Sequence, residues 1–383
     1  MTRWPDGALS SPVSGQALLA DTPHSLAAGP ERWPVVSDIP FLRADRRDLA
    51  DAALASLDAG DAERALALLL GDQDNWARTP PPTENDRAAL ASRPNSYTFR
   101  AAMDALAFGP VGTYFAHRWS DPTFLSGLAL AEAHWNSPAC VFELACGAGH
   151  YLREFARFAP LVAGADIVFA KLWLARRYVA PAARLLCFDA AAPWPLAGGS
   201  AGLVFCHDAF YFLPDKPHVA AEMLRVAGPN GRVLVGHAHN ALVDNLSAGD
   251  PLSPAGYAAL FGTPLLYDDR ELTRALVETR APVPRNVDAL ADAPAVAWAT
   301  GAPASRALSG GLTMPPPGAV LRRNPLYAGP DIRWPSERYR REYGPLATYP
   351  LRSDAPEWAV AGSDNATDHF ARHRVLLDLP RQW

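Results

Sequence analysis

The 383-residue sequence is poor in the features that mark secreted, membrane-spanning and nucleic-acid-binding proteins. Its 4 cysteines include no C-x-x-C pair and fall on or beside predicted buried strands, which indicates small buried side chains in a reducing compartment. No apolar run approaches the ~20 residues that span a bilayer, and residues 1–15 lack a signal-peptide core. A net charge of −5 offers no basic excess for phosphates. These absences predict a cytoplasmic protein without a membrane span and argue against a nucleic-acid partner.

Phosphate-binding motifs are absent from the stretch "VFELACGAGHYLREFA" (141–156), which contains neither G-x-G-x-x-G nor G-x-x-x-x-G-K-[ST]. An apolar run, a turn with Gly147 and Gly149, and a helical pattern nevertheless predict a strand, a loop and a helix. Glycines let the backbone approach a ligand, and a helix N-terminus offers free N–H groups. Glu143 lies four positions before the first glycine, where an acidic side chain disfavours phosphate and suits a cationic ammonium.

The pattern along the chain divides it into three segments. Residues 1–95 combine a turn-rich lead, a short β-like run and two short helices, with Asp61 as the N-cap of the second helix. Residues 96–302 alternate apolar runs with helical patterns, which predicts a parallel sheet covered by helices on both faces. Residues 303–383 are rich in proline, tryptophan, tyrosine and arginine, and we expect an extension that could cover the acceptor site. The candidate strands of the middle segment are 139–145, 161–165, 184–188, 202–207, 232–236 and 293–299.

Two further acidic residues follow the second and third candidate strands. Asp166 ends the second strand, 19 residues after Gly147, where a carboxylate can accept hydrogen bonds from ribose hydroxyls. Asp189 follows the third strand and would meet an adenine edge. Acidic residues at successive strand ends, together with a two-glycine loop, therefore indicate a ligand with an amino acid end, a ribose and an adenine.

The motifs resemble those of class I S-adenosylmethionine-dependent methyltransferases, most closely the group with quinone and small-molecule acceptors. "ELACGAGH" is similar to the family's first motif, "GADIVFAKLWLARR" to its second, "CFDAAAPWPLAGGSAGLVFCHDAFYFL" to its adenine motif and fourth strand, and "EMLRVAGPNGRVLVG" to its fifth strand. The resemblance implies an α/β fold with a Rossmann-like, doubly wound, mostly parallel sheet of seven strands. It also implies S-adenosyl-L-methionine as the cofactor.

The resemblance assigns most of the cofactor-binding residues. Glu143 would lie near the ammonium, Gly147 and Gly149 beside the methionine portion, Asp166 at the ribose, Ile167 against the adenine, Asp189 and Ala190 at the adenine edge, and His207 beside the sulfonium. In related enzymes a helix ahead of the first strand closes over the cofactor. Tyr114 would cover it there and Arg118 would pair with its carboxylate, although amphipathic packing is the other reading of that segment.

Two departures from the family pattern concern glycine and cysteine positions. Ala145 replaces the first glycine of the loop, a change that costs little unless the residue has a positive φ. "SPVSG" (11–15) followed by "WPVVSDIPFLR" resembles a small zinc-ribbon-like prefix domain, but Ser11 and Ser14 stand where that domain has cysteines. We therefore expect no metal; an unrelated helical cap is the alternative for this segment.

Polar residues that follow the fourth and fifth strands are the candidates for catalysis. His207, Asp208 and His237 are the predicted catalytic residues, because a histidine with a nearby carboxylate can remove a proton from the acceptor. Lining of the pocket and helix capping are the other roles open to them. Tyr211, His239 and Asn240 are the predicted substrate-binding residues.

The sequence thus predicts an enzyme that transfers a methyl group to a small-molecule acceptor, on oxygen, carbon or nitrogen, by in-line displacement. One alternative is an enzyme that uses the same cofactor without methylation, through attack on its aminoalkyl arm. The other is a cofactor-binding partner subunit without catalysis.

Overall fold

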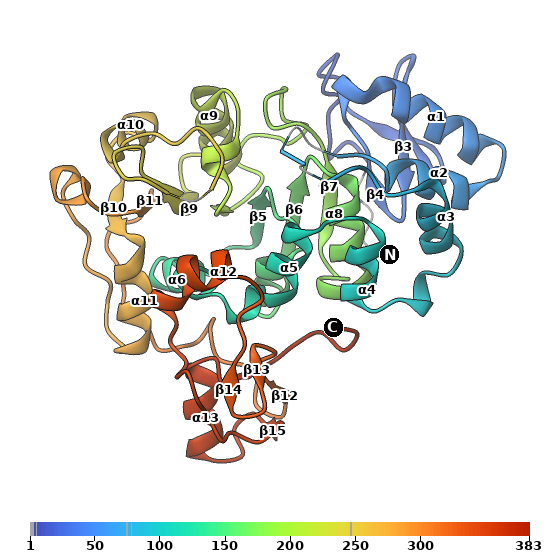
Figure 1. Ribbon diagram of the computed structural model, residues 1–383. Helices are drawn as coiled ribbons and strands as arrows, with labels where there is room; N and C mark the ends of the chain where they lie inside the picture. Colours follow the sequence, from blue (N-terminus) through green and yellow to red (C-terminus); the bar gives the residue numbers. More distant parts are fainter. Residues whose placement is uncertain (1–3, 5, 74–75, 78, 246) are drawn as a thin grey trace.

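The computed structural model describes residues 4, 6–73, 76–77, 79–245 and 247–383, and its centre is a seven-stranded sheet (Figure 1). The strands follow the order β10-β11-β9-β8-β5-β6-β7, in which β11 runs antiparallel to both of its neighbours and the other adjacent pairs are parallel. The strands are β5 (Cys140–Leu144), β6 (Leu161–Asp166), β7 (Arg184–Cys187), β8 (Leu203–His207), β9 (Arg232–His239), β10 (Leu265–Asp268) and β11 (Ala295–Thr300). This arrangement confirms the predicted Rossmann-like, mostly parallel sheet.

Helices cover both faces of the sheet, which explains why the strand sequences are continuously apolar. The helices of this segment are α4 (Phe99–Ala105), α5 (Pro110–His117), α6 (Pro122–Ala133), α7 (His150–Phe155), α8 (Phe169–Leu174), α9 (Lys216–Ala227), α10 (Pro254–Leu260) and α11 (Asp269–Val277). One hydrophobic cluster packs the helices α4, α5, α6, α7, α8 and α11 against one face of the sheet. A second cluster packs α9 and α10 against the other face. All six predicted strands are present, whereas β10 was not predicted.

The N-terminal segment folds as a small sheet with three helices beside it (Figure 1). Its elements are β1 (Leu19–Thr22), β2 (Ser25–Ala28), β3 (Glu31–Val36), β4 (Ile39–Pro40), α1 (Arg47–Asp58), α2 (Ala62–Leu69) and α3 (Glu84–Ser92). The Asp61 carboxylate accepts a hydrogen bond from the N–H of Arg64 (2.9 Å), which confirms the predicted N-cap of α2. In the turn at 11–14, the Ser11 hydroxyl accepts from the N–H groups of Val13 (3.1 Å) and Ser14 (3.2 Å).

The N-terminal segment also protects the open edge of the central sheet at β7. Phe41 forms a parallel bridge with Cys187, and the N–H of Leu42 donates to the carbonyl of Cys187 (2.7 Å). The next residue, Arg43, donates through Nη1 to the carbonyl of Ile167 (2.7 Å). An exposed edge strand invites pairing with other chains, and these contacts cover it.

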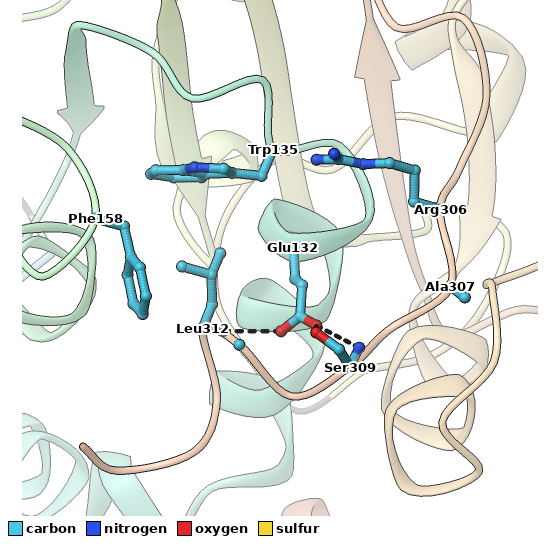
Figure 2. Close-up of a pocket in the computed structure, with 8 residues that line it drawn as sticks. Glu132, Trp135, Phe158, Arg306, Ala307, Ser309 and Leu312 are labelled. Atoms are coloured by element: carbon cyan, nitrogen blue, oxygen red, sulfur yellow. Dashed lines mark hydrogen bonds between the residues drawn. The ribbon is translucent and has the colours of Figure 1, made fainter. Parts of the chain in front are cut away.

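Residues 303–383 form small sheets and two helices below the central sheet in Figure 1. The elements are β12 (Val320–Arg323), β13 (Tyr327–Ala328), β14 (Asp331–Ile332), α12 (Glu337–Tyr343), β15 (Trp358–Val360), α13 (Asn365–Arg372) and β16 (Leu376–Leu377). Figure 2 shows how this segment is attached: the Glu132 carboxylate of α6 accepts from the N–H groups of Ser309 (2.6 Å) and Leu312 (2.9 Å). Trp383 Nε1 donates to the carbonyl of Ala116 in α5 (2.8 Å). The C-terminal segment is thus fixed to both α5 and α6.

None of the helices in the described part of the chain is long and apolar enough to cross a membrane.

Candidate functional site

The glycine loop follows β5 and has three residues in the left-handed backbone region. Ala145 has φ +53°, Gly147 +53° and Gly149 +80°, and α7 begins at the next residue. The condition under which alanine is costly at 145 is therefore met, because a left-handed conformation costs a residue with a Cβ about 1 to 2 kcal/mol. Strain of this size is typically retained where a ligand approaches the backbone.

Gly149 is expected to be the least replaceable glycine of this loop. A Cβ at this position would lie 2.9 Å from Ala175 Cβ and 3.3 Å from Ala180 Cβ, so Gly149→Ala adds a clash to backbone strain. We expect the free energy of unfolding to fall by about 2 to 4 kcal/mol. Gly60→Ala is the matched control, with the same φ of +80° and nothing within 4 Å, and should cost about 1 kcal/mol. Urea denaturation measures both; equal losses would contradict the packing argument.

Asp166, at the end of β6, is held against the glycine loop. Its carboxylate accepts from the N–H of Gly147 (3.0 Å) and the N–H of Val168 (2.9 Å), and Lys171 Nζ lies 3.6 Å away. A carboxylate has about four acceptor positions, so two remain for ligand hydroxyls. Gly147 and Asp166 are therefore together, as the sequence predicts.

Glu143 is buried beneath the same loop with unmet hydrogen-bonding capacity. Its Oε2 has no hydrogen-bond partner among the described residues. Burial raises the pKa of this carboxyl well above its usual value; the positive charge of Arg118 opposes the shift and the negative charge of Asp166 adds to it. An unpaired buried carboxyl is costly, and a cationic group in reach would satisfy it.

The aromatic ring of Phe115, in α5, lies on the loop. A Cβ placed on Gly147 would be 3.0 Å from Phe115 Cζ, and His150 Nε2 donates to the Phe115 carbonyl (2.9 Å). Two cavities, of about 430 and 240 Å³, lie elsewhere, and none of the predicted cofactor residues lines them; Figure 2 shows the smaller one. The Phe115 ring therefore covers the loop at Gly147 in this structure.

On the predicted adenine side, the polar groups serve mainly local turns. Asp189 Oδ1 accepts from the N–H of Ala191 (2.9 Å), and the carbonyl of Ala190 accepts from Trp194 Nε1 (3.0 Å). The Ile167 carbonyl is bonded to Arg43, a residue of the N-terminal segment that sequence reasoning missed.

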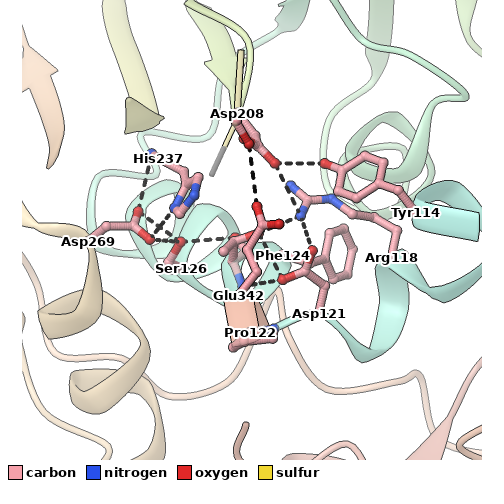
Figure 3. A network of polar contacts seen from close by, with 12 residues as sticks. Tyr114, Arg118, Asp121, Pro122, Phe124, Ser126, Asp208, His237, Asp269 and Glu342 are labelled. Carbon is pink, nitrogen blue, oxygen red and sulfur yellow. Dashed lines mark hydrogen bonds and ion pairs between the residues drawn. The ribbon is translucent and has the colours of Figure 1, made fainter. Parts of the chain in front are cut away.

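Asp208, directly after β8, is the centre of a buried polar network (Figure 3). Its two carboxylate oxygens accept from the hydroxyls of Tyr114 (2.8 Å) and Tyr211 (2.9 Å), and Arg118 Nη1 lies 3.7 Å away. Burial opposes ionisation, but the positive charges of His237, Arg118 and other neighbours lower the pKa of Asp208 to about 2. Asp208 also has φ +55°, so its backbone is strained.

His237, in β9, is paired with a second carboxylate. Its Nδ1 lies 2.8 Å from Asp269 Oδ2, and the Ser126 hydroxyl donates to the same carboxylate (2.9 Å). Burial alone would lower the pKa of His237, but the charges of Asp269 and Asp208 raise it to about 9. His237 is therefore an imidazolium near neutral pH and a poor general base in this state.

His207 is separate from the carboxylates. Neither of its ring nitrogens has a hydrogen-bond partner within the described part of the chain, and a Cβ on Gly236 would lie 2.3 Å from its Nδ1. Burial, reinforced by the charge of Arg118, lowers its pKa to about 3. Among the described residues, no carboxylate is hydrogen-bonded to His207 to activate it as a base.

The predicted substrate-binding residues divide into two groups. His239 stacks on Tyr211, with ring centroids 4.1 Å apart, and its Nδ1 is buried without a partner among described residues. Asn240 has a structural role instead, which corrects the prediction. Its Nδ2 donates to the carbonyls of Leu290 and Ala293, and its Oδ1 accepts from Leu242 N–H. Both polar side-chain atoms of Asn240 thus already have partners within the chain.

Arg118 was predicted to pair with a cofactor carboxylate, but the structure pairs it within the chain. Its Nη1 donates to Asp121 Oδ2 (2.7 Å), and both residues are buried. Burial is the largest influence on the pKa of Asp121 and raises it to about 6 despite the guanidinium. Sequence reasoning missed Asp121, Ser126 and Asp269. The local sequence marks two of these positions only as helix starts: Asp121 is the N-cap of α6, and Asp269 follows Asp268, the N-cap of α11.

Comparison with known proteins agrees with this geometry. Residues 142–235 match a family model described as "Methyltransferase domain". One similar solved structure is the YcgJ protein from Bacillus subtilis, with 17% identity and a TM-score of 0.31 over 39% of this chain and 75% of that chain. Another is a putative methyltransferase, BH2331, from Bacillus halodurans, with 15% identity and a TM-score of 0.32 over 46% of this chain and 94% of that chain. A third is an S-adenosylmethionine-dependent methyltransferase from Mesorhizobium loti, with 20% identity and a TM-score of 0.27 over 31% of this chain and 54% of that chain. The matched span runs from β5 into β9, so this part of the chain is a methyltransferase domain.

Proposed function

We propose that the acceptor is a small molecule bound over the ends of β8 and β9. The observation that carries this proposal is the burial of the polar side chains there. His207, Tyr211 and His239 are each at least 94% buried, and Tyr114 of α5 donates to their neighbour Asp208. A folded macromolecule could not bring its own side chain or base to this depth without removing α5, whereas a small acceptor can enter with a modest opening.

The cofactor-binding residues proposed from sequence fit their ligand in two respects. Glu143 has a buried, unpaired oxygen that suits the ammonium of the methionine portion, and Asp166 retains acceptor positions for ribose hydroxyls. We propose that Gly147, Gly149, Ile167, Asp189 and Ala190 complete the site from the loop and the adenine side. Arg118 is left out of the proposed cofactor contacts, since Asp121 already pairs it.

We propose S-adenosyl-L-methionine as the methyl donor; when bound it would supply a methyl group on a sulfonium, which in-line displacement transfers to the acceptor. The chain's own contribution is to align the acceptor and exclude water. Tyr211 and His239 would present stacked rings to it, and Asp208 would supply a fixed negative charge. Neither His207 nor His237 has a pKa close to neutrality, so we propose positioning rather than proton removal by histidine as their role.

An incubation with methyl-labelled S-adenosyl-L-methionine tests the acceptor class. A cell extract is separated into small-molecule and macromolecule fractions, and each is incubated with the protein. We expect label in a compound of the small-molecule fraction, together with S-adenosylhomocysteine. Label in the macromolecule fraction alone would refute a small acceptor. Release of 5′-methylthioadenosine would instead indicate attack on the aminoalkyl arm, and no product from any fraction would favour a non-catalytic subunit.

A further inference from the structure

Three potential ligand groups meet at the ends of β8 and β9. One carboxylate oxygen of Asp208 and one ring nitrogen each of His237 and His239 lie within 4.8 Å of one another. We propose that these three side chains bind one divalent transition-metal ion, of which Zn²⁺ is representative. None of the sequence motifs assigns a metal to these residues.

The spacing suits such an ion after a small adjustment. A tetrahedral ion bound at about 2.1 Å separates its ligand atoms by about 3.4 Å, so the three side chains need to close by little more than 1 Å. Two of the three ligands, Asp208 (φ +55°) and His237 (φ +48°), have strained backbones. Strain of this kind costs about 1 to 3 kcal/mol per residue and is characteristic of ligand-binding positions.

The surroundings of His237 match those of a metal-bound histidine. Asp269 Oδ2 lies 2.8 Å from Nδ1, which leaves Nε2 to face a metal, and Ser126 in turn donates to Asp269. Ligating histidines commonly donate their second N–H to a carboxylate, which fixes the tautomer and the ring orientation. The Ser126–Asp269–His237 chain spans α6, α11 and β9, so its parts come together only in the folded protein.

His239 supplies an independent observation. It is 94% buried, its Nδ1 has no partner among the described residues, and the Tyr211 ring stacked on it at an interplanar angle of 14° restrains its orientation. A buried polar atom without a partner is costly. A metal bound by Nδ1 would give this nitrogen a partner.

The charges of the network also call for a cation. Asp208 and Asp121 share the guanidinium of Arg118, so these two carboxylates carry one negative charge more than their counterion, and Asp269 pairs with His237. A divalent ion would offset the excess negative charge. Two nitrogens and one carboxylate oxygen favour Zn²⁺, Co²⁺ or Ni²⁺ over Mg²⁺ and Ca²⁺, which prefer oxygen ligands.

Three protein ligands leave a coordination position open, as in catalytic rather than structural zinc sites. An acceptor oxygen could occupy it, and a bound ion would lower the pKa of an acceptor hydroxyl. This role rests on the proposed function, whereas metal binding itself does not. The test therefore measures binding with no cofactor or acceptor present.

The experiment uses the full chain without a polyhistidine tag, stripped with EDTA and titrated with Co²⁺, whose visible absorption reports coordination. We expect one Co²⁺ per chain, displaced by Zn²⁺ and not by excess Mg²⁺. His239→Gln and Asp208→Asn should each weaken binding at least tenfold. Circular dichroism and S-adenosylhomocysteine binding establish that both variants are folded.

His369→Ala is the matched control, because the His369 and His373 rings lie 4.2 Å apart at the end of α13 and could bind a metal by themselves. This variant should bind Co²⁺ as the unmodified chain does. The proposal is overturned if His369→Ala abolishes binding, if folded His239→Gln and Asp208→Asn both retain it, or if the unmodified chain binds no Co²⁺. Methyl transfer that persists in EDTA would reject the role in the reaction without affecting the assignment of the site.

Discussion

Replacing Arg118 by methionine is expected to lower the free energy of unfolding by about 3 to 5 kcal/mol. The guanidinium is 97% buried, donates to Asp121 at 2.7 Å and lies 3.7 Å from Asp208. Methionine fills a similar volume but leaves both carboxylates without their cation in a region that excludes water. The pKa of Asp121 is about 6 with its guanidinium partner in place. At lower pH the carboxyl is protonated and carries no unpaired charge, so the loss of stability should be largest above pH 6. Urea denaturation at pH 5 and pH 8 measures both effects.

Arg340→Met is the control for Arg118→Met. Arg340 also pairs with an acid three residues away, Glu337 (2.6 Å), but both side chains are more than half exposed. Solvent screens such a pair, so this variant should unfold at the same urea concentration as the unmodified chain. If the two arginine variants behaved alike, Arg118 would not be holding a buried charge network together.

Replacing Asp166 by alanine is expected to weaken S-adenosylhomocysteine binding about 100-fold. We propose that this carboxylate accepts from ribose hydroxyls while it anchors the Gly147 and Val168 N–H groups. A hydrogen bond to a charged group contributes about 1.5 to 3 kcal/mol, and each ~1.4 kcal/mol corresponds to a factor of ten in affinity. Isothermal titration calorimetry measures the dissociation constant.

Asp61→Ala provides the matched comparison, since Asp61 also accepts a backbone N–H but caps α2 in the N-terminal segment. It should lower stability by about 1 kcal/mol and leave cofactor affinity unchanged. An Asp166→Ala variant that binds within about threefold of the unmodified chain would remove Asp166 from the ribose site.

The parts of this molecule that sequence predicts are those with local causes. β5, the turn at Gly147 and Gly149, and α7 follow one another within 16 residues, so an apolar run, two glycines and a helical pattern suffice. The capping of α2 by Asp61 is equally local. The Rossmann-like, mostly parallel sheet of seven strands followed from the succession of motifs, which a resemblance to a family supplied.

The parts that sequence missed depend on contacts between distant segments. Asp269 meets His237 32 residues away, and Arg43 reaches Ile167 across 124 residues. Nothing in the local pattern marks these pairs. β10 escaped notice because its four residues are only partly buried and precede a helix with a strong charge pattern. Asn240 was misassigned because its position beyond β9 suggested a ligand, whereas the carbonyls it binds lie 50 to 53 residues further on.

The ring of Phe115 against Gly147 has a consequence for affinity. If donor binding requires this cover to lift, the measured dissociation constant is the intrinsic one divided by the fraction of molecules in which α5 is open. If α5 is firmly packed, it shields a reactive sulfonium from water but lowers the affinity for the donor. If α5 opens readily, the affinity is higher and the shielding poorer. Residues that never touch the ligand, such as Trp383 through the Ala116 carbonyl, therefore tune occupancy as directly as those that line the loop.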